Sequence, residues 1–402
     1  MSLWRGGLAL GAVALTAAVA SGSRSLGVVG LGFVLASALT WMWTWVADSP
    51  ATVAFTVTPP RATEGDRVHV GVDVRRSSRL LLGSMSVKAT VGRLGPHSWR
   101  LRSGSRAARA ELDLDKPPRG VFRITDTEVE LRDLLGLVAL KPPVSWDPAT
   151  VVVWPRLVEL DGLFSEAGRI GLDGRRQLLR RAAGFDFHSV REHEQGESLR
   201  RVHWPTSARR GRLMVKELEE TANDGVVVLL DCDPAGAVGT PPRSSFDVAV
   251  RAAGSILQAH IRRGRSTTFV SSGRDRAVVR DRSAKADLDS VLGALASVVP
   301  DAQCGLARFL HDVEPSVASA GELVVVTATV DRAAFTAVSA LAGRRAISLV
   351  WIDAASFAMR PTRAEPGLLR LSTHGIPTAV VRRGDDLARV LSARMLEAVA
   401  RA

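Results

Sequence analysis

Residues 225–231 read GVVVLLD, a continuous apolar run that ends in an acid. A run of this length without polar alternation is typical of a strand that is buried on both faces, as in the parallel sheet of an α/β protein. Ligands of such sheets bind at the carboxyl ends of the strands. Asp231 and the loop that it begins, DCDPAG, therefore mark the place where we would expect chemistry.

The chain that follows Asp231 alternates between two patterns. Apolar residues recur at helical spacing in four stretches, and short apolar runs typical of strands separate them. The helical stretches are 244–263, 284–299, 331–343 and 385–402, and the strand-like ones are 266–272, 322–331, 345–353 and 376–382. This alternation predicts βαβ units, hence an α/β domain over 225–402 with a mainly parallel sheet and helices on both faces. No G-x-G-x-x-G follows the first strand and no G-x-x-x-x-G-K-[ST] occurs, so dinucleotide and P-loop nucleotide binding are not expected.

Residues 51–156 have a different character. Several short segments alternate apolar and polar residues, namely 51–58, 67–74, 85–91, 109–115, 120–131 and 150–155. Turn-like stretches such as LGPHSW (94–99) and DKPPRG (115–120) separate some of them. The pattern predicts a small β-sandwich. Nothing in it clusters like an active site, so we interpret it as a spacer or docking module.

The first 48 residues contain two uncharged apolar stretches. We predict a transmembrane hairpin with spans at about 4–22 and 26–47, because a helix needs about 20 apolar residues to cross a bilayer. A signal peptide is the alternative reading of the first stretch. Trp41, Trp43 and Trp45 are typical of the headgroup layer. Two crossings and the arginine beside the first span, Arg5, favour a multi-pass plasma-membrane protein whose main body is cytoplasmic.

The composition agrees with that location. The 402 residues carry 53 Lys and Arg against 41 Asp and Glu, a net charge of +12, and only two cysteines, Cys232 and Cys304. Two distant cysteines favour a reducing compartment over a disulfide framework. The positive charge alone does not choose among nucleic acid, anionic lipid and an acidic protein partner.

The connector, residues 157–224, holds the segment GFDFHSVREHEQGESLRRVHWPTSARRGRLMVK at 184–216. We name 184–216 the hallmark segment. The spacing of its histidines, His188, His193 and His203, does not favour a zinc site, and the chain has no G-x-S-x-G motif of a serine hydrolase. Glutamates interleaved with its arginines would repel a nucleic-acid backbone. We therefore expect neither an enzyme nor a nucleic-acid-binding site.

Two interpretations of the hallmark segment stay open. Arginine forks pair well with carboxylates, so Arg191 with Glu192, and Arg201 with Glu197 or Asp186, could form an ion-pair lattice over Phe187 and Trp204. Such a lattice would either lock the segment against the first strand of the sheet or present a charged docking surface.

The hallmark segment resembles the signature of domain-of-unknown-function family 58 (DUF 58). Its pattern is roughly G-x-[ED]-F-x-x-L-R-[ED]-Y-x-x-G-D-x-x-R-x-I-[DH]-W-x-x-[ST]-A-R. The stretch RGVFRITDTEVELRDLLGL at 119–137 also resembles a family motif. The matching residues that we name as candidates for partner docking are Asp186, Phe187, Arg191, Glu192, Gly196, Arg201, Trp204, Ser207 and Arg209.

The resemblance implies a von Willebrand factor A-like body, in which a D-x-S-x-S loop after the first strand often binds Mg²⁺. Here Asp231 fits that pattern, Asp233 replaces a serine, and Ala235 has no ligand atom. We therefore expect no metal or other cofactor. The resemblance also implies partners, a MoxR-type AAA+ ATPase and a transglutaminase-like membrane protein. We predict a membrane-held adaptor in envelope complex assembly; the alternative is a Mg²⁺-dependent ligand-binding protein that uses Asp231 and Asp233.

Overall fold

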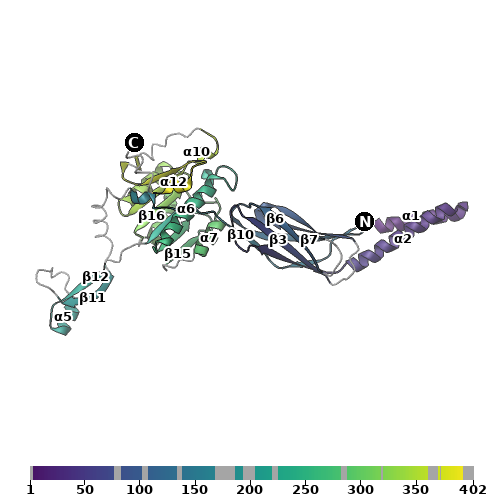
Figure 1. Ribbon diagram of the computed structural model, residues 1–402, viewed down its shortest axis with the longest axis horizontal. Helices are drawn as coiled ribbons and strands as arrows, with labels where there is room; N and C mark the ends of the chain where they lie inside the picture. Colours follow the sequence, from purple (N-terminus) through teal and green to yellow (C-terminus); the bar gives the residue numbers. More distant parts are fainter. Residues whose placement is uncertain are drawn as a thin grey trace. The chain divides into compact units, whose positions relative to one another are not determined.

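The computed structural model describes residues 3–76, 83–101, 107–133, 138–167, 186–192, 204–219, 225–281, 288–317, 320–360, 370–371 and 373–392 (Figure 1). The chain divides into two compact units, Met1–Arg156 and Leu157–Ala402. Helices and several β-sheets are both present, so the prediction of a mixed α/β protein is confirmed at that level.

The first unit begins with two helices, α1 (Leu3–Ser21) and α2 (Arg24–Ala47). They pack through small residues: a methyl group added at Gly30 would lie 2.9 Å from the Leu15 backbone nitrogen, and one added at Gly11 would lie 3.0 Å from the Gly30 carbonyl oxygen. Among the described residues, one helix, Arg24–Trp45, is long and apolar enough to cross a membrane. The described apolar part of α1, Arg5–Ser21, is shorter.

A β-sandwich follows the helices. One sheet has the strand order β6-β3-β1-β9, and the other has β2-β10-β7-β4-β5, with β8 paired to β7. The strands are β1 (Ala51–Thr58), β2 (Ala62–Thr63), β3 (Arg67–Arg76), β4 (Ser84–Val91), β5 (Pro96–Leu101), β6 (Ala107–Asp115), β7 (Gly120–Arg132), β8 (Ala139–Leu140), β9 (Val144–Trp146) and β10 (Thr150–Trp154). Alternating valines fill the core between the sheets, for example Val68, Val70 and Val72 of β3, which are fully buried.

The sequence pattern predicted one turn at the wrong position. We predicted a turn over 94–99, but the turn lies at Gly92–Leu94 and strand β5 begins at Pro96. Within β5, Trp99 and Leu101 are buried while Ser98 and Arg100 are exposed. Trp99 also donates an indole hydrogen bond to the Val70 carbonyl at 3.2 Å. Burial of this large ring outweighs the turn preference of the neighbouring Gly-Pro pair.

The chain enters and leaves the sandwich at opposite ends. At the entry, Arg76, the last residue of β3, donates to the carbonyl of Ala47 at 2.5 Å. At the exit, Glu64 accepts from the backbone nitrogen of Arg156 at 3.2 Å, and its own nitrogen bonds to the Trp154 carbonyl. Strand β3 begins next to the exit and ends at the entry. Its ten residues set the separation at about 30 Å, since a strand rises about 3.3 Å per residue.

The second unit is built on a six-stranded sheet of order β15-β14-β13-β16-β17-β18. All neighbours are parallel except β15, which is antiparallel to β14. The strands are β13 (Val226–Leu230), β14 (Thr267–Ser271), β15 (Val278–Asp281), β16 (Glu322–Thr327), β17 (Ala346–Ile352) and β18 (Thr378–Val381). Strand order reverses at β13, because β14 lies on one side of it and β16 on the other.

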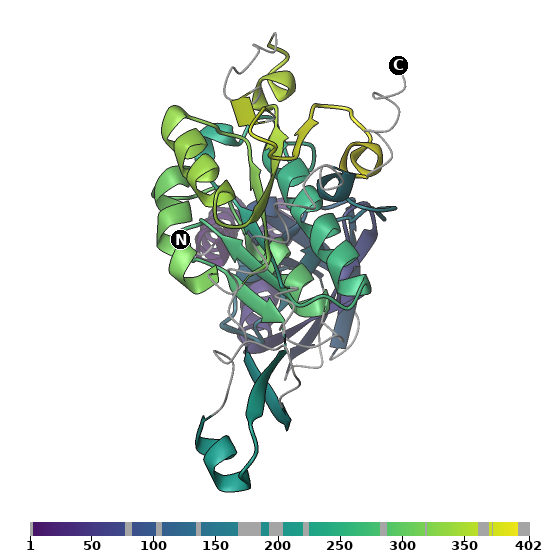
Figure 2. The same ribbon diagram turned by 90° about the vertical axis from the view of Figure 1, so that its left-hand side faces the viewer.

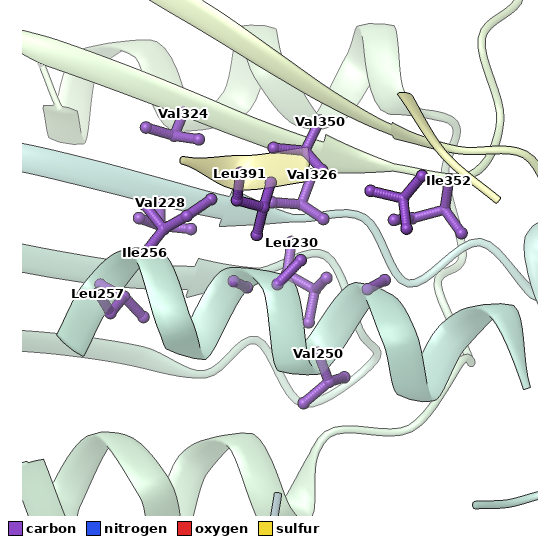
Figure 3. Close-up of a cluster of buried hydrophobic side chains, with 14 of the residues drawn as sticks. Val228, Leu230, Val250, Ile256, Leu257, Val324, Val326, Val350, Ile352 and Leu391 are labelled. Atoms are coloured by element: carbon purple, nitrogen blue, oxygen red, sulfur yellow. The ribbon is translucent and has the colours of Figure 1, made fainter. Parts of the chain in front are cut away.

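Helices cover both faces of this sheet (Figure 2). On one face α6 (Ser245–Arg262), α7 (Leu288–Ser297) and α12 (Leu387–Leu391) pack on Val226, Val228 and Leu230. Figure 3 shows Val250, Ile256 and Leu257 of α6 on the side of the sheet where Val228 and Leu230 lie. On the other face α8 (Leu306–Val313) and α9 (Arg332–Ala342) pack on Val227 and Leu229. Because alternate residues of β13 enter different cores, its sequence shows no polar alternation.

Several elements of the second unit were not predicted, or were predicted differently. Strand β15 and helix α8 had no prediction, and short helices lie at α3 (Phe164–Ala167) and α10 (Ala354–Phe357). The predicted closing helix over 385–402 is described only as far as α12, after which Ser392 has an extended backbone with ψ of 150°. Residues 393–402 lie outside the described residues.

Candidate functional site

Asp231 lies directly after β13, at the point where the strand order reverses. In open α/β sheets this carboxyl-end position is where ligands bind. Neighbouring strands bring three hydroxyl side chains to the same edge: Ser272 follows β14, Thr327 ends β16, and Thr329 lies two residues further on. We name Asp231, Ser272, Thr327 and Thr329 the strand-end cluster.

The hydroxyls of the strand-end cluster all point to the carboxylate. Thr327 donates to Asp231 Oδ2 at 2.7 Å and Thr329 donates to the same oxygen at 3.1 Å. Ser272 donates to Oδ1 at 3.2 Å, and the Asp233 backbone nitrogen also donates to Oδ1 at 3.2 Å. Both oxygens therefore accept two hydrogen bonds. Asp231 ties the loop after β13 to the ends of β14 and β16.

Burial dominates the electrostatics of this cluster. Asp231 is 5% exposed, and loss of solvation raises the pKa of its carboxyl above the ordinary value despite the hydroxyl donors. The neighbouring thiol of Cys232 is fully buried, and burial, aided by the Asp231 charge, raises its pKa to about 12. A thiol with so high a pKa is not a nucleophile at neutral pH.

The loop DCDPAG offers few further ligand atoms. Asp233 accepts from the Ala235 nitrogen at 2.9 Å and caps the short turn Pro234–Gly236, while Ala235 has no donor atom. Mg²⁺ prefers six oxygen ligands in near-octahedral geometry. The donor set fits that ion only in part, because the serine-type ligands of the loop are missing and Asp231 is already bonded on both oxygens. In the described part of the chain, no three His, Cys, Asp or Glu side chains gather as metal ligands.

The sequence did not single out Ser272, Thr327 and Thr329. One signal was present for Ser272, which ends the strand-like run 266–272, whereas Thr327 and Thr329 lie within the run 322–331. Which of the strand ends lie next to β13 depends on the strand order, and the sequence does not reveal that order.

The connector contains a hairpin that sequence reasoning missed. Strand β11 (Asp186–Glu192) pairs antiparallel with β12 (Met214–Glu219), and helix α5 (Trp204–Arg210) precedes β12. The predicted residues Asp186, Phe187, Arg191 and Glu192 are on β11, but their side chains lie outside the described part of the structure. Gly196 and Arg201 lie outside the described residues altogether. The ion-pair lattice therefore stays a prediction.

Helix α5 carries the other three predicted residues, Trp204, Ser207 and Arg209. Ser207 is buried, and its hydroxyl accepts from the Met214 nitrogen at 2.8 Å, which fixes α5 against the start of β12. Trp204 is 62% exposed and Arg209 is exposed. The helix thus separates a residue that holds the local structure from residues that face solvent.

A pocket of about 520 Å³ opens beside β18. Phe164 and Val390 contribute apolar lining, and Arg382, Arg389, Asp385 and Asp386 contribute charges of both signs. Both aspartates serve the local turn: Asp385 accepts from the Arg382 nitrogen at 2.8 Å, and Asp386 caps α12. The pocket therefore presents no convergent set of reactive groups.

Comparisons with known proteins bear on the connector and the sheet. A family model described as "Protein of unknown function DUF58" matches residues 189–356, so the resemblance seen in the hallmark segment is confirmed over that range. The chain is also similar to the uncharacterized protein YeaD of Bacillus subtilis (strain 168), at 25% identity over 273 residues. That match covers 65% of this chain and 66% of YeaD, slightly less than two thirds of the relative's length.

Two solved structures are similar to small parts of the chain. The CARDB domain of a Pyrococcus furiosus protein, solved with di-metal ions, has 14% identity and a TM-score of 0.20, and the match covers 26% of this chain and 93% of that domain. The seventh ScaB type I cohesin of Pseudobacteroides cellulosolvens has 10% identity and a TM-score of 0.17, with 27% and 94% covered. Neither likeness is close enough to inform fold or function.

Proposed function

We propose that the protein is a membrane-anchored adaptor that holds protein partners at the cytoplasmic face of the plasma membrane. In this proposal α1 and α2 both span the bilayer, the sandwich is a spacer, and the second unit is a von Willebrand factor A-like body that binds partners without transforming a substrate. A MoxR-type AAA+ ATPase and a transglutaminase-like membrane protein are the proposed partners.

The anchor is supported by the first two helices. α2 meets the length and hydropathy expected of a span, and the seam of small residues between α1 and α2 is typical of helix pairs in membranes. Many large apolar side chains of the pair are exposed, among them Leu10, Val28 and Trp45. Trp43, by contrast, packs against the core of the sandwich, so only part of the predicted tryptophan belt is available to the headgroup layer.

The observation that carries the proposal is the geometry of the sandwich. The chain enters beside Ala47 and leaves at Arg156, about 30 Å away along β3. Buried side chains brace both ends: Arg76 holds the end of α2, and Glu64 holds the exit. A folded spacer between an anchor and a body suits a protein that holds partners at a membrane.

The body is supported as a binding module by its topology and by the state of Asp231. A parallel sheet with covered faces and an acid at the end of its first strand agrees with a von Willebrand factor A-like fold. The carboxylate at the position expected for chemistry is buried and bonded on both oxygens. The MoxR-type partner is supported by the family resemblance alone.

Crosslinking in intact cells tests the adaptor function. We expect formaldehyde treatment followed by purification of the full-length protein to recover a MoxR-type AAA+ ATPase. The control is the same pair of helices fused to an unrelated soluble domain, which should not recover it. Equal recovery with the control, or protease sensitivity of the second unit in spheroplasts, would contradict the proposal.

One observation favours the rival function, Mg²⁺-dependent ligand binding. The hydroxyls of Ser272, Thr327 and Thr329 converge on Asp231, and hydroxyl and carboxylate oxygens are the hard ligands that Mg²⁺ takes. In this rival, Asp231 and Asp233 would hold the ion together with hydroxyls that turn away from their present hydrogen bonds. Titration with the metal distinguishes the two functions.

A further inference from the structure

Helix α5 and the turn after it form a surface that is both apolar and basic. Trp204 is 62% exposed and Leu213 is 43% exposed, and Arg209, Arg210 and Arg212 are exposed between them. We name these five residues the arginine–tryptophan surface. Of the described tryptophans outside α1 and α2, Trp204 has the largest exposed fraction.

Trp204 is exposed on a segment that has a fixed local structure. Directly beside these residues, Ser207 and Met214 are buried, and the Ser207 hydroxyl also donates to the Met214 carbonyl at 3.4 Å. The segment therefore has a fixed local structure in which the indole ring of Trp204 is left exposed. An exposed tryptophan on an ordered segment is a candidate interaction site, because large aromatic rings contribute much of the binding energy where they become buried.

The charge of the surface selects the partner. Residues 204–213 contain three arginines and no acid. In the described part of the chain, no ion pair is formed by Arg209 or Arg210. The planar guanidinium fork binds carboxylates in bidentate geometry, and tryptophan accommodates both an aliphatic side chain and a flanking arginine.

We infer that the arginine–tryptophan surface binds an acidic segment of a protein partner whose large aliphatic side chains pack on the exposed apolar residues, above all on Trp204. This inference rests on the proposed adaptor function and names the chemistry of its partner. Carboxylates of the segment would pair with Arg209 and Arg210, and charge complementarity would fix its direction and speed its association.

An anionic membrane offers negative charge as well, so the experiment below includes it as a competing outcome.

Fluorescence anisotropy with a synthetic peptide tests the inference. The protein is full-length and held in nanodiscs of neutral phosphatidylcholine, and the probe is a labelled EDLEDLLEE peptide with QNLQNLLQQ and EDSEDSSEE as controls. We expect saturable binding of the first peptide alone. Arg209→Glu with Arg210→Glu should weaken it by about tenfold or more, and Trp204→Ala should weaken it comparably.

A matched pair of exposed arginines on other helices provides the control. Arg308→Glu with Arg332→Glu makes the same change in net charge, and it should leave binding within about twofold. Equal binding of the neutral peptide, equal loss in the control variant, or no binding of the acidic peptide would each overturn the inference.

Two further outcomes separate the alternatives. Protection of residues 204–213 from hydrogen exchange in nanodiscs with 30% phosphatidylglycerol, unaffected by the acidic peptide, would assign the surface to the membrane and overturn the inference. If cells still yield the crosslinked ATPase with the Arg209→Glu and Arg210→Glu variant, the adaptor function stands while this docking surface fails.

Discussion

The strand-end cluster and the arginine–tryptophan surface contrast in how their polar groups are satisfied. Asp231 is buried and accepts four hydrogen bonds, from the Asp233 nitrogen and from the three hydroxyls of the strand-end cluster. Arg209, Arg210 and Trp204 face solvent. A group that is fully bonded within the fold stabilises the fold, whereas exposed arginines and an exposed ring are available to another molecule. The contrast favours a structural role for Asp231 and agrees with the docking surface that we propose on α5.

The largest effect that we expect is a difference in reactivity between the two cysteine thiols. Cys232 lies inside the strand-end cluster with its pKa raised to about 12 by burial, whereas Cys304 is partly exposed. At pH 8 the thiolate population of Cys232 falls about a thousandfold below that of an ordinary cysteine. We expect iodoacetamide to modify Cys304 and leave Cys232 unmodified, as read by peptide mass spectrometry. Comparable labelling of both would mean that the cluster opens readily.

Replacing Asp231 tests whether the carboxylate is structural. Asp231→Leu leaves buried hydroxyls and the Asp233 nitrogen without their acceptor, so we expect a loss of about 2–4 kcal/mol in stability of the second unit. Asp231→Asn keeps an acceptor oxygen and should cost less than half of that. Thermal unfolding followed by circular dichroism measures both. Similar midpoints for the two variants would show that the hydrogen bonds contribute little.

Ser207 and Trp204 make the corresponding pair on α5. Ser207→Ala removes the acceptor of the Met214 nitrogen, so the opening free energy at that amide should fall by about 1–2 kcal/mol. Hydrogen exchange at Met214 should then be about 5- to 30-fold faster. Trp204→Ala should leave that rate unchanged, because the ring is mostly exposed. Faster exchange in the Trp204 variant would make the ring structural rather than available for binding.

The pH dependence of stability gives the smallest effect. The pKa of Asp231 is raised in the folded state by burial, so the folded carboxyl keeps its proton at a pH where the unfolded one has lost it. Stability should therefore be greatest below the ordinary aspartate pKa. It should fall as the pH rises through the raised folded value and then remain level. Asp231→Asn should lack this component, as measured by thermal midpoints of the two proteins from pH 3 to pH 7. A parallel pair of profiles would contradict it.

The regular elements could be predicted where one physical signal dominates. The bounds of β1 follow from apolar residues at every second position, and α6 agrees with the predicted 244–263 within a residue because Ser244 supplies a capping box with Asp247. Strand β13 was predictable because two covered faces leave no polar position in it.

Other features depend on pairing that the sequence does not reveal. The hairpin β11–β12 is rich in charge and lacks the alternation of a core strand, and β5 was hidden by the Gly-Pro pair before it. The hydroxyl partners of Asp231 lie about 40 and 100 residues away along the chain, so only strand order brings them together. The exposure of Trp204 likewise depends on tertiary structure. From the sequence alone, the same indole could have been an apolar anchor beneath an ion-pair lattice.

Calorimetric titration with Mg²⁺ or Mn²⁺ tests the contrast between the two regions most directly. The full-length protein is titrated in neutral-lipid nanodiscs beside Asp231→Ala. Because Asp231 is bonded on both oxygens and Ala235 contributes no ligand, we predict no saturable heat with either ion in either protein. A saturable heat that Asp231→Ala abolishes would contradict the account and assign the strand-end cluster to metal-dependent ligand binding.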